Sequence, residues 1–83
     1  MNKKEIENHM KSIFVKDFGV SREALKPTAH LFNDLGLDSI DAIDMAVRLE
    51  KETGLKLKAL ELRSIRTFED VVNMIHNRLK KES

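Results

Sequence analysis

The first part of the chain alternates apolar and charged positions with the spacing of an amphipathic helix. Its apolar side chains recur every three or four residues: Ile6, Met10, Ile13, Phe14 and Phe18. Asn2 and Glu5, three residues apart, form a capping pair at the start, and Gly19 provides a left-handed residue at the end. We therefore expect a first helix between Asn2 and Gly19.

Residues 19–37 are predicted to be mostly connection. Lys26 precedes the only proline and is biased away from helical geometry, while Asn33, Asp34 and Gly36 supply turn chemistry. A helical turn is expected within residues 21–26. Connections of this length are uncommon in small domains and are usually functional.

A second helix is predicted from Asp38, as its cap, to Thr53, with Gly54 ending it. It carries two apolar rows, which together are wider than one core contact requires. One row is expected to include the core residues Met45, Ala46 and Leu49, together with Ala42. The other row is formed by Ile40, Ile43 and Val47, and part of this wide apolar arc is expected to face a partner.

The sequence pattern of the last part of the chain predicts two more helices. Leu55 and Leu57 alternate with lysines as in a strand fragment, but the run is too short to sustain a sheet. A short third helix is expected over residues 59–64. Thr67 and Asp70 form a capping box before a final helical stripe. That stripe consists of Phe68, Val71, Val72, Ile75 and Leu79.

Length and composition narrow the classes of function. An 83-residue chain with no cysteine has one modest core, no disulfide framework and no thiol nucleophile. We therefore expect a protein that is not an enzyme. The first ten residues are polar, and no stretch approaches the roughly 18 apolar residues of a membrane helix. We expect a cytoplasmic protein without membrane insertion.

The net charge of +1 hides an uneven distribution. Residues 31–53 carry a net charge of −4, whereas residues 1–30 carry +2 and residues 54–83 carry +3. An acidic central segment favours basic partners. A nucleic-acid partner is not expected, because the overall charge is near zero and there is no Tyr or Trp for stacking on bases. The three histidines lack the spacing of metal ligands, so no metal site is expected.

Ser39 is the residue with the most informative surroundings. It lies in the first turn of the predicted second helix, where backbone amides can stabilise a phosphate attached to its hydroxyl. Asp38 and Asp41 would repel a free phosphate, but a covalently bound phosphodiester could tolerate them. No histidine lies near Ser39 in the sequence to activate it as a hydrolase nucleophile. Judged by itself, an Asp-Ser pair at a helix start is more often only a cap; the surrounding pattern favours a modification site.

These residues resemble the acyl carrier protein family, whose hallmark is an Asp-Ser-Leu-like triplet opening the second of four helices. The triplet here is Asp38-Ser39-Ile40. The resemblance continues through residues 34–36 and through Asp41, Ile43, Asp44 and Leu49. It implies an all-α fold, a small antiparallel four-helix bundle with a long loop between helices 1 and 2 and a short third helix. It also implies a 4'-phosphopantetheine arm, donated by coenzyme A, on Ser39, with Asp38 beside it.

The resemblance further implies which residues meet partner enzymes. A phosphopantetheinyl transferase and acyl-loading, synthase or acyltransferase enzymes are the expected partners of a monomeric carrier. Apolar contacts are expected from Ile40, Ile43 and Val47, and acidic contacts from Asp41 and Asp44. The space between the second and third helices is expected to hold an acyl chain, as in the family.

The chain departs from the family in one respect. Typical members add carboxylates on the third helix, whereas this chain has Lys58, Arg63 and Arg66 there, and Arg48 interrupts the acidic face of the second helix. Because charge governs which enzymes dock, Arg63 and Arg66 are expected to redirect partner choice. This favours a specialised carrier for fatty acid, lipid or polyketide biosynthesis.

Three alternatives remain open from the sequence. A peptidyl carrier is the nearest, although those domains commonly have a second glycine before the serine where this chain has Leu37-Asp38. A D-alanyl carrier is another. The third is an unmodified helical interaction module in which Ser39 only caps a helix. In each case residues 1–83 are expected to form a single domain.

Overall fold

The computed structural model describes residues 2–82, and the side chains of all of these except residues 59, 81 and 82. Four α-helices occupy the described part: α1 (Lys3–Phe18), α2 (Ser39–Thr53), α3 (Ala59–Ser64) and α4 (Phe68–Glu82), with a 3-10 helix (Arg22–Ala24) after α1. The chain is therefore all-α, as predicted. No helix in the described range is both long and apolar enough to cross a membrane.

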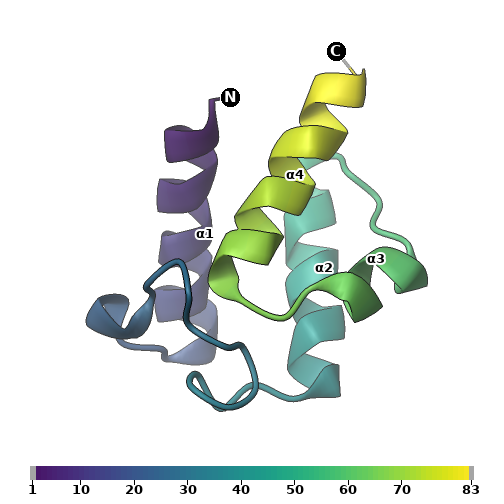
Figure 1. The fold of residues 1–83 in the computed structure, drawn as a ribbon. Helices are drawn as coiled ribbons and strands as arrows, with labels where there is room; N and C mark the ends of the chain where they lie inside the picture. The colour runs from purple at the N-terminus through teal and green to yellow at the C-terminus, as the bar shows by residue number, and fades with distance from the viewer. Residues whose placement is uncertain (1, 83) are drawn as a thin grey trace.

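The three long helices pack lengthwise and α3 crosses beside them (Figure 1). α1 runs opposite to α2 and α4, whereas α2 and α4 run in the same direction because the segment containing α3 returns the chain to the other end (Figure 1). The start of α2 consequently lies at the end of the molecule away from the start of α1 (Figure 1). This arrangement leaves the first turn of α2 at the same end as the long connection.

The ends of the first helix form as predicted. The side chain of Asn2 accepts the backbone N–H of Glu5 at 2.8 Å, and the side chain of Glu5 accepts the backbone N–H of Asn2 at 3.0 Å. Gly19 follows with φ of +66°, a left-handed conformation that side chains other than hydrogen disfavour. The same reciprocal pattern joins Thr67 and Asp70 at the start of α4.

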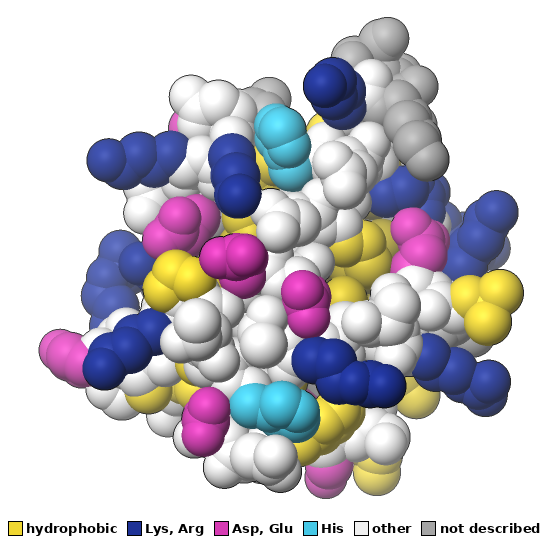
Figure 2. Space-filling model, in the orientation of Figure 1, with side chains coloured by type: hydrophobic (Ala, Val, Ile, Leu, Met, Phe, Trp, Pro, Cys, Tyr) yellow, Lys and Arg dark blue, Asp and Glu magenta, His cyan; other side chains and the backbone are white. Residues whose placement is uncertain are grey.

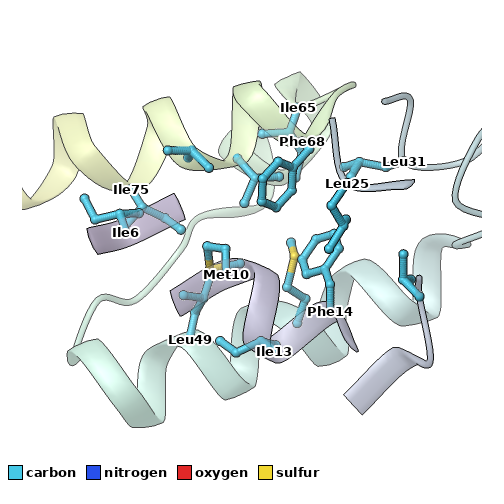
Figure 3. Packing of buried hydrophobic residues seen from close by; sticks show 14 of the residues in the cluster. Ile6, Met10, Ile13, Phe14, Leu25, Leu31, Leu49, Ile65, Phe68 and Ile75 are labelled. Carbon is cyan, nitrogen blue, oxygen red and sulfur yellow. The ribbon is translucent and has the colours of Figure 1, made fainter. Parts of the chain in front are cut away.

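The core is formed where the apolar stripes of α1, α2 and α4 meet (Figure 3). Phe14 of α1 and Phe68 of α4 meet edge to face, with ring centroids 5.5 Å apart. Met45 and Leu49 are buried and Ala46 is half-buried, so the predicted core row of α2 is confirmed. The buried residues of the described cluster are Ile6, Met10, Ile13, Phe14, Val20, Leu25, Leu31, Met45, Leu49, Leu55, Ile65, Phe68, Val71, Val72 and Ile75.

Leu55 and Leu57 do not form a strand, which agrees with the expectation that this run is too short to sustain a sheet. Residues 54–58 form an irregular segment, in which Leu55 is only 2% exposed and belongs to the core. Its backbone N–H donates to the side chain of Thr53 instead of to a neighbouring strand. Leu57 is half-buried and also packs against the core. The alternation of leucine and lysine therefore reflects a connection whose two leucines face the core, and residues 2–82 contain no strand beside it.

The long connection between α1 and α2 is tied to the start of α4. The backbone N–H of Leu31 donates to the carbonyl of Arg66 at 2.9 Å, and that of Phe68 donates to the carbonyl of Ala29 at 3.0 Å. These bonds flank an isolated antiparallel bridge between His30 and Thr67. The expected helical turn is the 3-10 helix (Arg22–Ala24). The connection is thus held against the joint between α3 and α4.

Candidate functional site

Ser39 is the first residue of α2 and its side chain is exposed. Among residues 2–82, its hydroxyl takes part in none of the hydrogen bonds found. Gly36, three residues before Ser39, has a φ of +69°. This left-handed conformation turns the chain toward the start of α2. The hydroxyl is therefore presented to solvent at the start of a helix, where backbone N–H groups favour an attached anion.

Asp38 and Asp41 close the N-terminus of α2 with a reciprocal capping box. The side chain of Asp38 accepts the backbone N–H of Asp41 at 2.9 Å, and the side chain of Asp41 accepts the backbone N–H of Asp38 at 3.1 Å. Both bonds satisfy donors that the helix leaves unpaired. Asp38 therefore fixes the start of the helix at Ser39, as the sequence predicted for a cap.

The loop that leads into Ser39 is internally bonded around His30. Its ring Nδ1 accepts the backbone N–H groups of Phe32 at 3.2 Å and Asn33 at 3.1 Å, and Asp34 accepts the backbone N–H of His30 at 2.8 Å. Sequence reasoning did not identify this role, because a single histidine carries no local signal. The residues Asn33, Asp34 and Gly36 indicated a turn here, but not the bonds to His30.

The predicted partner row of α2 faces solvent. Ile40 is 75% exposed, Ile43 is 59% exposed and Val47 is 45% exposed. Leu60 of α3 is 76% exposed and Phe32 of the loop is 40% exposed, and sequence reasoning selected neither as a surface residue. These five residues are the large apolar side chains that the described part of the chain leaves exposed, and Ile40 directly follows Ser39.

Arg48 lies close to one aspartate of α2 and one aspartate of α1. Asp44 lies 3.7 Å from Nε of Arg48, and Nη1 of Arg48 lies 3.4 Å from a carboxylate oxygen of Asp17 on α1. Arg48 thus interrupts the acidic face, as predicted, and also joins α2 to α1. Its Nε is buried and has no hydrogen-bond partner among the described residues, because the oxygen of Asp44 is too far away to accept a hydrogen bond.

A groove of about 480 Å³ opens between α2 and α3, with Ser39 in its lining. Its lining residues are Phe32, Ser39, Ala42, Ile43, Leu62, Arg63, Ile65 and Arg66. Beneath it the space between the helices is almost filled, with a void of about 10 Å³ among Leu31, Met45 and their neighbours. The space expected to hold an acyl chain is therefore a surface groove, while the interior is packed.

The groove side formed by α3 is basic. Figure 2 shows lysine and arginine side chains along the right-hand edge of the molecule, over α3 and the segment before it. Arg63 and Arg66 are both exposed, and Nη1 of Arg66 donates to the carbonyl of Arg63 at 3.1 Å. Acidic residues therefore lie at the start of α2 and basic residues lie across the groove.

Two carboxylates hold the segment that carries these arginines. The backbone N–H of Lys58 and the guanidinium of Arg78 lower the pKa of Glu61 below its ordinary value. The backbone N–H groups of Arg66 and then Thr67 lower the pKa of Asp70 in the same way. Hydrogen bonds to the ionised form are the cause in both cases.

The described residues contain no group of three or more His, Cys, Asp or Glu side chains arranged to hold a metal ion. His9 instead contacts Glu52, with Nε2 and Oε2 2.6 Å apart, and so links α1 to α2. His30 bonds its own loop.

Two comparisons with known proteins bear on this site. Residues 8–75 match the protein family described as "Phosphopantetheine attachment site". The chain is also 40% identical over 79 residues to "Acyl carrier protein 2" from Ralstonia nicotianae, an alignment that covers 95% of this chain and 98% of that protein.

Both matches extend over most of the chain, from α1 through α4. Acyl carrier proteins are carriers rather than enzymes, and they interact with phosphopantetheinyl transferases and acyl-handling enzymes. Their cofactor is a covalently attached 4'-phosphopantetheine. Together with the four helices and the exposed serine, these matches confirm the resemblance seen in the sequence: the chain belongs to the acyl carrier protein family.

Proposed function

We propose that Ser39 is the residue that carries the 4'-phosphopantetheine. The observation that supports this most directly is its position: an exposed hydroxyl on the first residue of α2, within the triplet Asp38-Ser39-Ile40. The reciprocal cap between Asp38 and Asp41 keeps this hydroxyl at a fixed place on the surface. The proposed role of Asp38 is to lie beside the cofactor and, through that cap, to hold the start of α2 in place.

Loading would require a transferase and coenzyme A. The hydroxyl oxygen of Ser39 forms a bond to phosphorus, the phosphoanhydride bond of coenzyme A breaks, and adenosine 3',5'-bisphosphate leaves while the transferase takes the hydroxyl proton. The thiol of the attached group then holds acyl groups as thioesters. The chain's own contribution is to present them to each partner at high effective concentration.

Partner enzymes are proposed to dock on the surface that surrounds Ser39. Its apolar part is the exposed row of Ile40, Ile43 and Val47. Its charged part comprises Asp41, Asp44, Arg63 and Arg66. The exposure of the row supports this assignment, because apolar side chains at the centre of an interface contribute most when water is excluded from them.

The mixed charge of this surface supports a specialised carrier for fatty acid, lipid or polyketide biosynthesis. An enzyme that meets only an acidic carrier surface would place basic groups opposite Arg63 and Arg66, and like charges across an interface cost affinity. We further propose that residues 1–83 form one carrier domain, that it is a monomer, and that it acts in the cytoplasm, where coenzyme A is present. Light scattering after size exclusion tests the monomer.

Intact mass tests the attachment site. The purified chain is incubated with coenzyme A and a broad-specificity phosphopantetheinyl transferase, and it is expected to gain the mass of one phosphopantetheinyl group. Ser39→Ala is expected to gain nothing, whereas Ser64→Ala, which removes a serine of α3, retains the gain. Circular dichroism checks that both variants fold. A gain in Ser39→Ala, or none in the native chain with several active transferases, would overturn the assignment.

The same experiment separates the alternatives. The acyl or aminoacyl group found on the loaded chain distinguishes an acyl carrier from a peptidyl or D-alanyl carrier. A chain that no transferase modifies would support an unmodified interaction module. In that module the cap of α2 would be Asp38 and not Ser39, because the side chain of Asp38 accepts the backbone N–H of Asp41.

A further inference from the structure

Two guanidinium groups on the α3 side of the groove form no salt bridge with any described side chain. Arg48 and Arg78 form ion pairs, but neither Arg63 nor Arg66 has a carboxylate within ion-pair distance among the side chains of residues 2–58 and 60–80. Nη1 of Arg66 is used by the carbonyl of Arg63, which draws this guanidinium back over the end of α3. Both side chains line the same groove as Ser39.

The residues of this groove fit the phosphopantetheine group. The group begins with a phosphodiester, which is an anion, and continues into a branched hydrocarbon segment and two amides. The groove supplies two cationic side chains and an apolar wall formed by Phe32, Ala42, Ile43, Leu62 and Ile65. Its volume of about 480 Å³ lies within the range of about 300–1,000 Å³ that is usual for small-ligand sites.

We propose that Arg63 and Arg66 bind the phosphodiester on Ser39 of the same molecule and hold the arm in the groove between α2 and α3. This inference rests on the proposed attachment at Ser39. It gives the two arginines a role within the free carrier, whereas docking would use them against a second protein. The arm leaves the groove when an enzyme takes it up, so the two roles follow one another.

Charge determines the side to which the phosphodiester turns. The carboxylates of Asp38 and Asp41 flank Ser39 and do not line the groove, and they disfavour an anion next to them. Guanidinium groups are well suited to the opposite role, because their planar donors match phosphate oxygens. Because the contact is exposed, we expect it to be modest in strength and to weaken with salt.

The test uses the loaded protein alone, with no partner enzyme present. Amide NMR spectra of the unloaded and loaded forms are compared for the native chain, for R63Q/R66Q, and for R22Q/K26Q. The last variant removes the same two charges from the long connection, outside the groove. Intact mass is measured first, so that every spectrum of a loaded form comes from a chain that carries the arm.

Loading the native chain is expected to shift amides along the groove, at Ala42, Ile43, Leu62 and Ile65, and to make the phosphorus NMR shift depend on salt. In R63Q/R66Q these changes should shrink as the population of held arm falls about two- to fivefold, the effect expected for an exposed ion pair. The control R22Q/K26Q should behave as the native chain does.

Two results would overturn the inference while leaving the attachment site intact. One is a set of shifts confined to residues 38–41 in the native chain. The other is equal groove shifts in R63Q/R66Q and the native chain. A chain that gains no mass would overturn both proposals together.

Discussion

Arg78 of α4 contacts Glu61 of α3, with Nη1 and Oε1 2.5 Å apart, and its Nη2 donates to the carbonyl of Lys56 at 3.1 Å. A helix as short as α3 (Ala59–Ser64) has little stability of its own. The contact therefore attaches α3, and with it one wall of the groove, to α4.

Replacing Arg78 by Gln is expected to loosen α3 more than it destabilises the whole protein. The pair is partly exposed, so we expect a loss of about 1 kcal/mol in the free energy of unfolding. Amides of residues 59–64 should exchange with solvent faster than those of α1. Arg22→Gln, at an exposed arginine of the 3-10 helix, is the control. Equal protection of α3 in Arg78→Gln and the native chain would contradict the prediction.

Because the pKa of Asp70 is lowered in the folded state, the free energy of unfolding is expected to depend on pH in the acidic range. Its folded-state pKa lies below the ordinary value of 3.8, because the backbone N–H groups of Arg66 and Thr67 bind the ionised form. The carboxylate therefore stabilises the fold above about pH 4, and this contribution is lost as the pH falls through the folded-state pKa. Unfolding measured from pH 2.5 to pH 6, about the window set by such shifts, should show a flatter acid limb for Asp70→Asn.

Glu69→Gln is the matched control for that profile, since the neighbouring side chain accepts neither of the bonds made by Asp70. It removes one carboxylate from the same helical turn. If Asp70→Asn and Glu69→Gln show the same pH profile as the native chain, Asp70 does not contribute as described.

His30→Phe is expected to destabilise the loop before Ser39. Phenylalanine retains a ring beside Phe32, but it lacks the Nδ1 acceptor for the backbone N–H groups of Phe32 and Asn33. Because water can partly replace these bonds, we expect a loss of about 1 kcal/mol in the free energy of unfolding. Hydrogen exchange at residues 32 and 33 should accelerate. His76→Phe, on α4, is the control, and faster exchange at those two amides in it would argue against a specific role.

The two apolar rows of α2 differ in exposure: the row that contains Ile40 faces solvent, and the row that contains Leu49 is in the core. Ile40→Ala is expected to change the free energy of unfolding by less than about 0.5 kcal/mol, whereas Leu49→Ala in the core should cost about 2–5 kcal/mol. If Ile40 meets partners, its substitution should raise the KM of a phosphopantetheinyl transferase several-fold. A stable Ile40→Ala chain with unchanged KM would remove this residue from the docking surface.

Reversing the charge of α3 tests partner choice directly. R63E/R66E is expected to change association rates with cognate enzymes at low ionic strength, with the difference shrinking as salt is added. K3E/K4E applies the same charge change at the start of α1, outside the groove, and should have the smaller effect. Unchanged kinetics with every cognate partner would contradict a role for Arg63 and Arg66 in docking.

Local signals in the sequence predicted the helices well, because a cap involves residues only three apart. The Asn2 and Asp38 caps both formed with the partners that the spacing indicates. The alternation at Leu55 and Leu57 left the conformation of residues 54–58 undecided, because alternation alone does not show whether another strand is available for pairing. Likewise, no local pattern links His30 to Thr67, which are brought together by folding.

The sequence by itself determined the four helices, the exposed serine at the start of α2 and the family to which they belong. Each depends on short-range spacing or on a motif that is continuous in the chain. Only the tertiary structure decided that Arg63 and Arg66 line the same groove as Ser39, that the interior between α2 and α3 is filled, and that Arg78 holds α3. These features join residues far apart in the chain, so their geometry exists only after the helices have packed.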